Sequence, residues 1–143
     1  MGTKSAACTD EQSTKVPCTR EAIHENFVIA HDGVLVRHEM LEAINTAKRS
    51  IGMASYIFDN DPTGKLFIDA LCRAVDRGVS VRVLIDGIGS RYSFPTSVGL
   101  LRQKGVPVAR FMPTTVPLYL PYANLRNHRK ILIVDGERGF TGG

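Results

Sequence analysis

From residue 127 to residue 135 the chain reads Asn-His-Arg-Lys-Ile-Leu-Ile-Val-Asp, which places a histidine, a lysine and a carboxylate around one apolar run. The run 131–134 is typical of a buried strand. If residues 127–134 form one strand, His128 and Lys130 share a face, roughly 6–7 Å apart, because side chains alternate. A histidine can attack phosphorus or move a proton near neutral pH. A neighbouring lysine can hold the phosphoryl oxygens, so the pair favours phosphodiester chemistry.

The role of Asp135 is left open by its spacing. Alternation puts it on the face opposite His128 unless the strand ends first. Asp135 is followed by Gly136, and Asp-Gly is a strong hairpin-turn pattern. The carboxylate can therefore orient the site or shape the turn. Taken singly, the histidine, the lysine and the aspartate each have an ordinary structural explanation, and only their combination favours a site.

The pattern H-x-K-x4-D, followed after six residues by Gly142 and Gly143, resembles the signature of the phospholipase D superfamily. The resemblance to the superfamily covers residues 26–143. The stretches that resemble the bacterial cardiolipin synthases in particular are 40–48, 50–59, 64–78, 79–86 and 124–136.

This resemblance implies an α/β fold, a phospholipase-D-like α/β/α sandwich with a mixed sheet. It implies a phosphatidyltransferase that joins two phosphatidylglycerols through a phosphohistidine, with no metal and no nucleotide cofactor. His128 would be the nucleophile or the acid/base, Lys130 would bind phosphate and Asp135 would support the geometry of the site. The further residues expected to bind substrate are Tyr56, Arg126, Asn127, Gly142 and Gly143. Arg126 would share the His128 face if the strand starts early.

Family enzymes build one active site from two such motifs, and this sequence holds one. The family signature also continues past the glycine pair to an asparagine that this sequence does not reach. We therefore expect the first half of a phospholipase-D-like domain, truncated just after the motif. Its partner would be a second motif in the same longer chain or in a homodimer. The alternatives are a phospholipase or nuclease of the same superfamily, and a non-catalytic fragment.

Composition supports an anionic partner without selecting one. The formal net charge is +4 and the pI about 9.1, which favours anionic partners such as phospholipid headgroups, an anionic membrane surface or nucleic acid. The resemblance implies phosphatidylglycerol at a membrane surface, with nucleic acid a less favoured partner. The sequence contains no apolar stretch of membrane-spanning length and no signal peptide. It predicts a cytoplasmic protein, peripheral to the bacterial inner membrane. Walker, zinc, Rossmann and Gly-x-Ser-x-Gly patterns are absent from the sequence.

The chain divides into a disordered leader, residues 1–22, and one phospholipase-D-like domain, residues 23–143. Alternating strands and helices predict crossover units on a sheet. The expected strands are 27–30 and 34–36, with a hairpin turn at Asp32-Gly33 between them, and 51–58, 79–86, 106–111 and 127–134, with a short return strand from Gly139. The expected helices are 39–48, 61–77 and 96–104. The second helix is expected to face the core with Leu66, Phe67, Ala70, Leu71, Ala74 and Val75. Asp59 and Asp86 follow strands, where helix capping and turn formation are their favoured roles. The apolar segment 112–126 is expected to be a functional or packing loop.

Overall fold

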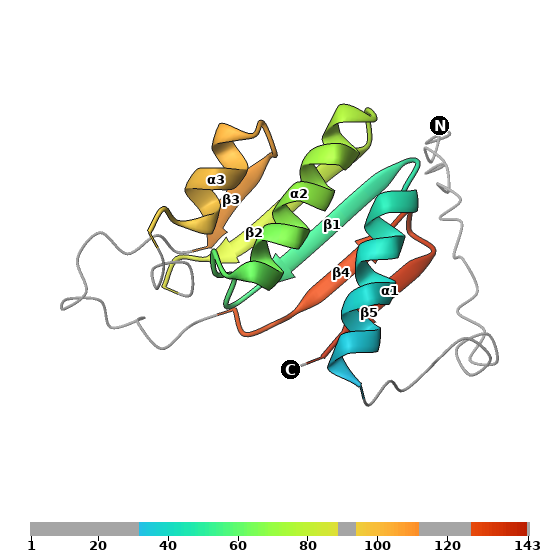
Figure 1. Ribbon diagram of the computed structural model, residues 1–143, viewed down its shortest axis with the longest axis horizontal. Coiled ribbons are helices and arrows are strands. Elements are labelled where there is room, and N and C mark those ends of the chain that lie inside the picture. The colour runs from blue at the N-terminus through green and yellow to red at the C-terminus, as the bar shows by residue number, and fades with distance from the viewer. Residues whose placement is uncertain (1–31, 89–93, 112–126, 143) are drawn as a thin grey trace, which may run out of the picture. The chain divides into compact units, whose positions relative to one another are not determined.

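The computed structural model describes residues 32–88, 94–111 and 127–142, which form a five-stranded mixed sheet and three helices (Figure 1). The strand order is β3-β2-β1-β4-β5. In chain order the elements are α1 (Gly33–Thr46), β1 (Ser50–Ser55), α2 (Pro62–Asp76), β2 (Ser80–Asp86), α3 (Ser97–Gln103), β3 (Val108–Phe111), β4 (Ile131–Val134) and β5 (Arg138–Thr141). The predicted α/β class with a mixed sheet is confirmed.

The sheet combines a parallel half with an antiparallel half. Strands β1, β2 and β3 run parallel, and the crossovers between them contain α2 and α3. Strand β4 pairs antiparallel with β1, and β5 returns antiparallel beside β4. The carboxyl ends of β1 and β2 therefore lie at the same edge of the sheet as the beginning of β4. This topology brings together segments that are far apart in the sequence.

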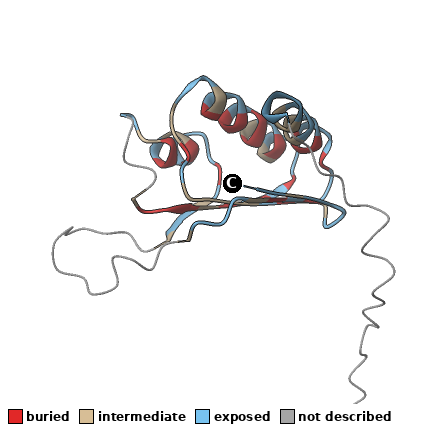
Figure 2. Cartoon of the chain, turned by 90° about the horizontal axis from the view of Figure 1, so that it is seen from below, coloured by how far each residue is buried: buried red, intermediate tan, exposed pale blue. Residues whose placement is uncertain are grey.

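The hydrophobic core lies between the sheet and one layer of helices. Figure 2 shows the three helices over the same face of the sheet, with buried residues on the surfaces that meet. Burying one large aliphatic side chain contributes about 1.5–3 kcal/mol. The largest fully buried apolar side chains are Ile44, Ile51, Ile68, Leu71, Ile85, Leu101, Leu132 and Val106.

Helix α1 corrects the prediction for its region. Asp32-Gly33 was expected to form a hairpin turn and Val34–Val36 a strand, but the helix begins at Gly33. The reason is local, because the Asp32 carboxylate accepts a hydrogen bond from the backbone N–H of Val34 at 2.8 Å. This bond satisfies one of the N–H groups that an N-terminus leaves free, so Asp32 acts as an N-cap. The proposed strand 27–30 lies outside the described residues.

Helix α2 begins as the sequence predicts. The Asp61 carboxylate accepts from the N–H of Gly64 at 2.6 Å, and Pro62 occupies the first turn. Gly78 follows the helix with φ +83°, the left-handed conformation expected of a C-terminal glycine. One predicted core residue is wrong: Leu66 is 50% exposed, and Ile68 is buried instead. Leu66 lies at the edge of the apolar stripe and faces away from the sheet.

Gly64 is required where α2 approaches the preceding loop. A Cβ at this position would overlap the carbonyl oxygen of Asp59. We therefore expect Gly64→Ala to lower the free energy of unfolding by about 1–3 kcal/mol, the usual cost of overpacking. Gly52→Ala is the matched control, because a Cβ there meets nothing within 4 Å, and it should change stability by about 0.5 kcal/mol or less. Urea unfolding measures both, and equal effects would contradict the close approach.

Strand β4 begins later than predicted. Residues 127–130 precede the strand, so side-chain alternation does not place His128 and Lys130 on one face. The Asn127 side chain accepts from the N–H of Arg129 at 3.3 Å, and such a local bond competes with strand pairing. The return strand is also longer than expected, because β5 pairs with all four residues of β4. The remaining predicted elements agree with the structure within a few residues at each end.

Candidate active site

Five of the predicted site residues lie at the edge of the sheet where β1 and β2 end and β4 begins: Tyr56, Asn127, His128, Lys130 and Gly142. Tyr56 directly follows β1, and Asp86 is the last residue of β2. His128 and Lys130 lie just before β4, which runs antiparallel to β1. Since Ile131 pairs with Thr141, Gly142 follows β5 at the same edge where Lys130 precedes β4. Sequence positions more than 80 residues apart thus contribute to one edge.

Tyr56 fixes the plane of the His128 imidazole. The two rings are stacked, with centroids 4.2 Å apart and planes inclined by 26°. A stack covers one face of the imidazole and leaves its ring nitrogens free, because their lone pairs and N–H bonds lie in the ring plane. His128 is exposed, and within the described residues its ring has no hydrogen-bond partner. The arrangement suits a nucleophile or a proton donor that meets a ligand from solvent.

Lys130 supplies positive charge beside this histidine. Its side chain is exposed, and it forms no ion pair with any residue in the part of the chain that the structure describes. An unpaired ammonium group next to an imidazole is suited to the oxygens of a phosphoryl group. Arg129 lies between the two and is also exposed. The site therefore faces solvent with cationic groups available for an anion.

Asn127 shapes the segment that carries the histidine. Its side-chain oxygen accepts a hydrogen bond from the backbone N–H of Arg129. This bond forms a turn in which His128 is the middle residue. Its own N–H donates to Oδ2 of Asp86 at 3.4 Å. Asn127 thus acts on the backbone in this structure, while its predicted contact with substrate stays a prediction. The predicted site residues Arg126 and Gly143 lie outside the described residues.

Asp135 lies at the opposite end of β4 from His128 and Lys130. Five residue steps separate Lys130 from Asp135, which corresponds to roughly 17 Å along a strand. The Asp135 carboxylate accepts three backbone N–H groups, from Lys48 at 2.9 Å, Arg49 at 2.7 Å and Ser50 at 2.9 Å. The structure therefore places the aspartate on the connection between α1 and β1, not beside the histidine.

The electrostatics of Asp135 follow from these hydrogen bonds. Donation by the backbone of Lys48, Ser50 and Arg49 lowers the pKa of the carboxyl from 3.8 to about 2, since all three favour the ionised form. Asp135 also has φ +56°, followed by Gly136 with φ +72°. Two successive positive φ values are typical of tight hairpin turns, and here residues 135–137 connect β4 to β5. Of the two roles left open by the sequence, the structure shows the shaping of the turn.

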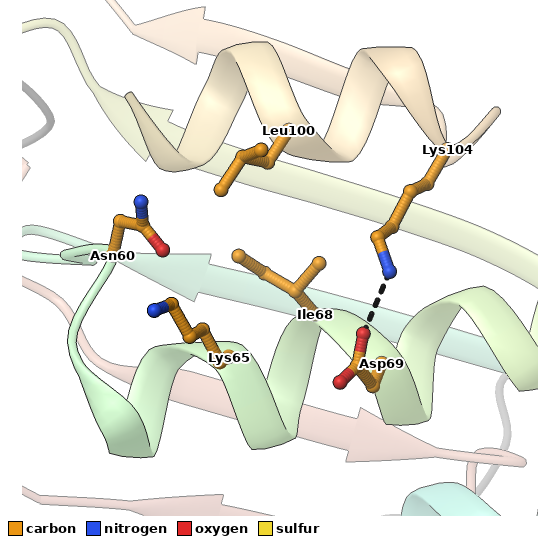
Figure 3. Close-up of a pocket in the computed structure, with 6 residues that line it drawn as sticks. All are labelled: Asn60, Lys65, Ile68, Asp69, Leu100 and Lys104. Atoms are coloured by element: carbon orange, nitrogen blue, oxygen red, sulfur yellow. Dashed lines mark hydrogen bonds and ion pairs between the residues drawn. The ribbon is translucent and has the colours of Figure 1, made fainter. Parts of the chain in front are cut away.

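A cavity lies between α2 and α3 (Figure 3). It has a volume of about 270 Å³ and is lined by Asn60, Lys65, Ile68, Asp69, Leu100 and Lys104. Lys104 and Asp69 form an ion pair of 2.7 Å across it, and this hydrogen-bonded partner raises the pKa of Lys104. None of the residues predicted to form the site lines this cavity.

Asp86 contributes more than sequence reasoning assigned to it. A turn-forming role was favoured, and its carboxylate does accept from the N–H of Ile88 at 2.9 Å. The second contact, with Asn127, was not anticipated, because the two residues are 41 positions apart. The available indication was an aspartate directly after an apolar strand in a parallel arrangement, where sites gather at the carboxyl ends.

Comparisons with known proteins agree with the fold and the motif. A family model described as "Cardiolipin synthase, PLD-like domain" matches residues 40–143. Cardiolipin synthase 1 of Bacillus anthracis is 35% identical over 149 residues, covering 93% of this chain and 29% of that protein. Cardiolipin synthase 1 of Bacillus cereus is 42% identical over 105 residues, covering 73% of this chain and 21% of that protein. The chain thus spans less than a third of the length of these relatives.

Solved structures show the same architecture. Nuc from Salmonella typhimurium, described as a phospholipase D family member, aligns with a TM-score of 0.51 and 30% identity, covering 69% of this chain and 57% of that one. NucT from Helicobacter pylori aligns with a TM-score of 0.58 and 19% identity, covering 81% and 70%, and supports the fold alone. Since the family model matches well over half of the residues, the chain belongs to the phospholipase-D-like domain family represented by cardiolipin synthase.

Proposed function

We propose that this chain supplies one histidine–lysine half of a phosphatidyltransferase site of the cardiolipin synthase type. The observation that carries the proposal is the exposed His128 imidazole, stacked on Tyr56, in a chain 35% to 42% identical to two cardiolipin synthases. Lys130 lies two residues away with its charge unpaired among the described residues. The substrate class would be phosphatidylglycerol, whose phosphodiester is the anion that this site requires.

The first half-reaction would form a covalent intermediate. A ring nitrogen of His128 attacks the phosphorus of phosphatidylglycerol, and the bond from phosphorus to the glycerol headgroup oxygen breaks. Glycerol leaves with a proton donated by the histidine of a second motif. Lys130 stabilises the negative charge on the phosphoryl oxygens as the transition state forms. The product of this step is a phosphatidyl-histidine.

The second half-reaction would restore the histidine. A hydroxyl of a second phosphatidylglycerol attacks the phosphorus and gives its proton to the histidine of the second motif. The bond between His128 and phosphorus breaks, and cardiolipin is released. Two phosphatidylglycerols thus yield one cardiolipin and one glycerol, with no change of oxidation state. His128 and the second histidine could exchange these two roles, because a covalent mechanism needs one nucleophile and one acid/base.

The second motif would come from a longer chain or from a second copy. This sequence holds one H-x-K-x4-D pattern, and the matched region is 21% of one relative and 29% of another. A chain that has neither source of a second histidine would bind phosphate without turning it over. This non-catalytic state is the alternative that an activity assay must separate from the proposal.

Hydrolysis is the second candidate, favoured by the similarity to Nuc at 30% identity. In this reaction water accepts the phosphatidyl or phosphodiester group, and the first step is unchanged. A nuclease would bind its substrate through phosphates with steep salt dependence. The formal charge of +4 suits either anionic partner.

A membrane surface is the proposed place of action, at the cytoplasmic side of the bacterial inner membrane. In the described part of the chain, no helix is long and apolar enough to cross a bilayer. The proposal is peripheral contact with anionic lipid, because the lipid substrate lies in the bilayer and the chain is basic. The loop 112–126, for which the sequence leaves open an interfacial contact or packing against a second half, lies outside the described residues.

Product analysis tests the function directly. The complete natural protein that contains this chain is incubated with vesicles of headgroup-labelled and acyl-labelled phosphatidylglycerol, and the products are separated. Release of labelled glycerol with formation of cardiolipin supports transfer. Release of glycerol with formation of phosphatidic acid identifies a phospholipase. Cleavage of a labelled oligonucleotide without attack on lipid identifies a nuclease, and no reaction on any substrate identifies a non-catalytic chain.

The stack on His128 predicts a graded effect of changes at Tyr56. Tyr56→Ala removes the ring that fixes the imidazole plane, and kcat should fall by about tenfold to a hundredfold, the usual cost of misplacing a reacting group. Tyr56→Phe keeps the stacked ring and should retain most of the activity. Steady-state rates of both variants make the comparison. If Tyr56→Phe loses as much as Tyr56→Ala, the phenol hydroxyl and not the stack is what the reaction needs.

A further inference from the structure

Asp86 is a buried carboxylate at the end of β2. It is 1% exposed and, with Ser97, makes up the buried polar and charged side chains of the described residues. Burying a charged group is costly unless it is hydrogen-bonded. Asp86 has no role in the reaction proposed above, so its contacts must explain why this carboxylate is buried.

The two oxygens of Asp86 hold two different segments. Oδ1 accepts from the N–H of Ile88 at 2.9 Å, which closes the turn after β2. Oδ2 accepts from the N–H of Asn127 at 3.4 Å, in the residue just before His128. The carboxylate therefore joins the end of a central strand to the segment that carries the histidine.

Three contacts together determine where His128 lies. Tyr56 stacks on its ring from the end of β1. The side chain of Asn127 holds the backbone at His128 in a turn by accepting a hydrogen bond from the N–H of Arg129. The contact with Asp86 ties the backbone of this turn to β2. Without it, the turn would lose its attachment to β2, which lies beyond β1 in the sheet.

We propose that Asp86 is a positioning residue for His128, acting through the backbone of Asn127. Asp86 is 1% exposed, so it acts on the histidine through the backbone and not on a substrate directly. Its carboxylate sets the position of the histidine turn relative to the sheet. That position determines the distance between the imidazole nitrogen and the phosphorus of a bound substrate. The effect on rate rests on the function proposed above, whereas the attachment of the turn does not.

The test is Asp86→Asn in the complete natural protein. Asparagine has one acceptor oxygen in place of two, so one of the two backbone N–H groups loses its acceptor. Hydrogen exchange of the Asn127 amide should become at least about tenfold faster, because the turn opens more readily. The kcat for phosphatidyl transfer should fall by about tenfold to a hundredfold. KM should change little, because the Asp86 side chain is buried and presents no surface to the lipid.

Ser97→Ala is the matched control. Ser97 is also buried and donates a hydrogen bond to the carbonyl oxygen of Phe58, so its loss lowers stability without touching the histidine turn. It should leave Asn127 exchange and kcat close to wild type once the samples are compared well below their Tm. If Ser97→Ala reproduces the Asp86→Asn losses, the effect of Asp86 is global stability and the proposal is overturned.

Wild-type protein gives a second test that needs no variant. The Asn127 amide should exchange more slowly than in an unstructured peptide, and exchange at the peptide rate would overturn the proposed attachment. If the wild type transfers no phosphatidyl group but protects this amide, and Asp86→Asn removes the protection, the positioning contact stands and the proposed function fails. If the wild type is active and Asp86→Asn retains both its kcat and its amide protection, the positioning role fails and the function stands.

Discussion

Replacing His128 with asparagine is expected to reduce the rate of phosphatidyl transfer by at least about a thousandfold, the scale on which loss of a covalent nucleophile acts. The side chain of asparagine is polar and of similar reach, but its amide nitrogen has no free lone pair with which to attack phosphorus. The same loss is expected if His128 is the acid/base, because the glycerol leaving group then departs without a proton. The measurement is the initial rate of glycerol release from labelled phosphatidylglycerol.

His38→Asn is the control for this substitution. His38 is exposed on α1, so the chemical change is identical but lies on a helix that contributes none of the proposed site residues. It should keep the wild-type rate, and both variants should keep the wild-type Tm because neither histidine is buried. A His128→Asn protein that works at the wild-type rate would remove His128 from the chemistry.

Replacing Asp135 is expected to lower stability far more than it lowers the rate per folded molecule. Asp135→Asn takes the charge from an acceptor of three backbone N–H groups, those of Lys48, Arg49 and Ser50, and charge-assisted bonds are the stronger kind. We expect Tm to fall by several degrees at pH 7. Since Asp135 and His128 lie at opposite ends of β4, kcat should change by less than about tenfold. Thermal unfolding and steady-state rates separate the two effects.

The pH dependence of this loss has a definite sign. The folded-state pKa of Asp135 is lowered to about 2 from the usual 3.8. Above about pH 4 the carboxyl is ionised in both states and its stabilisation is complete. As the pH falls from about 4 to about 2 the unfolded chain takes up the proton first, and the stabilisation is lost. The Tm difference between wild type and Asp135→Asn should therefore shrink in this window.

Asp69→Asn provides the comparison for Asp135. Asp69 forms one exposed ion pair, with Lys104, and exposed pairs contribute little. Its substitution should change Tm by much less at pH 7. A Tm loss for Asp135→Asn no larger than that for Asp69→Asn would contradict the anchoring role of the three backbone bonds.

These two predictions divide the motif into two functions. In H-x-K-x4-D the four residues before the aspartate are Ile131 to Val134, which are the whole of β4. The histidine and the lysine stand before the strand, and the aspartate stands after it. The four-residue spacing between the lysine and the aspartate is thus the length of one strand. One end carries the residues of the proposed chemistry, and the other joins the strand to the connection between α1 and β1.

The sequence predicted those elements whose capping and periodicity agree. For α2, an aspartate cap, a proline in the first turn and a closing glycine all mark the same helix, and the structure follows them. For α1 the patterns conflict, because Asp32-Gly33 reads equally well as a hairpin turn. Only the hydrogen bond from Val34 to the Asp32 carboxylate decides between the two. Capping of this kind depends on backbone direction, which spacing does not reveal.

The site could be predicted as far as its residue types, but not its contacts. Side-chain alternation predicts that residues 127–130 continue the strand, but a turn closed by the side chain of Asn127 replaces the strand there. The stack of Tyr56 on His128 and the bond from Asn127 to Asp86 both come from sheet pairing between distant segments. Local sequence carries no record of such pairing. The motif identifies the histidine, but the residues that contact the histidine and its turn depend on the topology of the sheet.

The covalent intermediate is the most direct test of the central claim. The complete natural protein is mixed with acyl-labelled phosphatidylglycerol, the reaction is stopped within milliseconds to seconds, and the digested protein is read by mass spectrometry under conditions that preserve phosphoramidate bonds. We predict a phosphatidyl group on the peptide that contains His128, or on the histidine of the second motif with its accumulation dependent on His128. Rapid turnover with no labelled histidine at any time, or labelling that persists unchanged in His128→Asn, would contradict it.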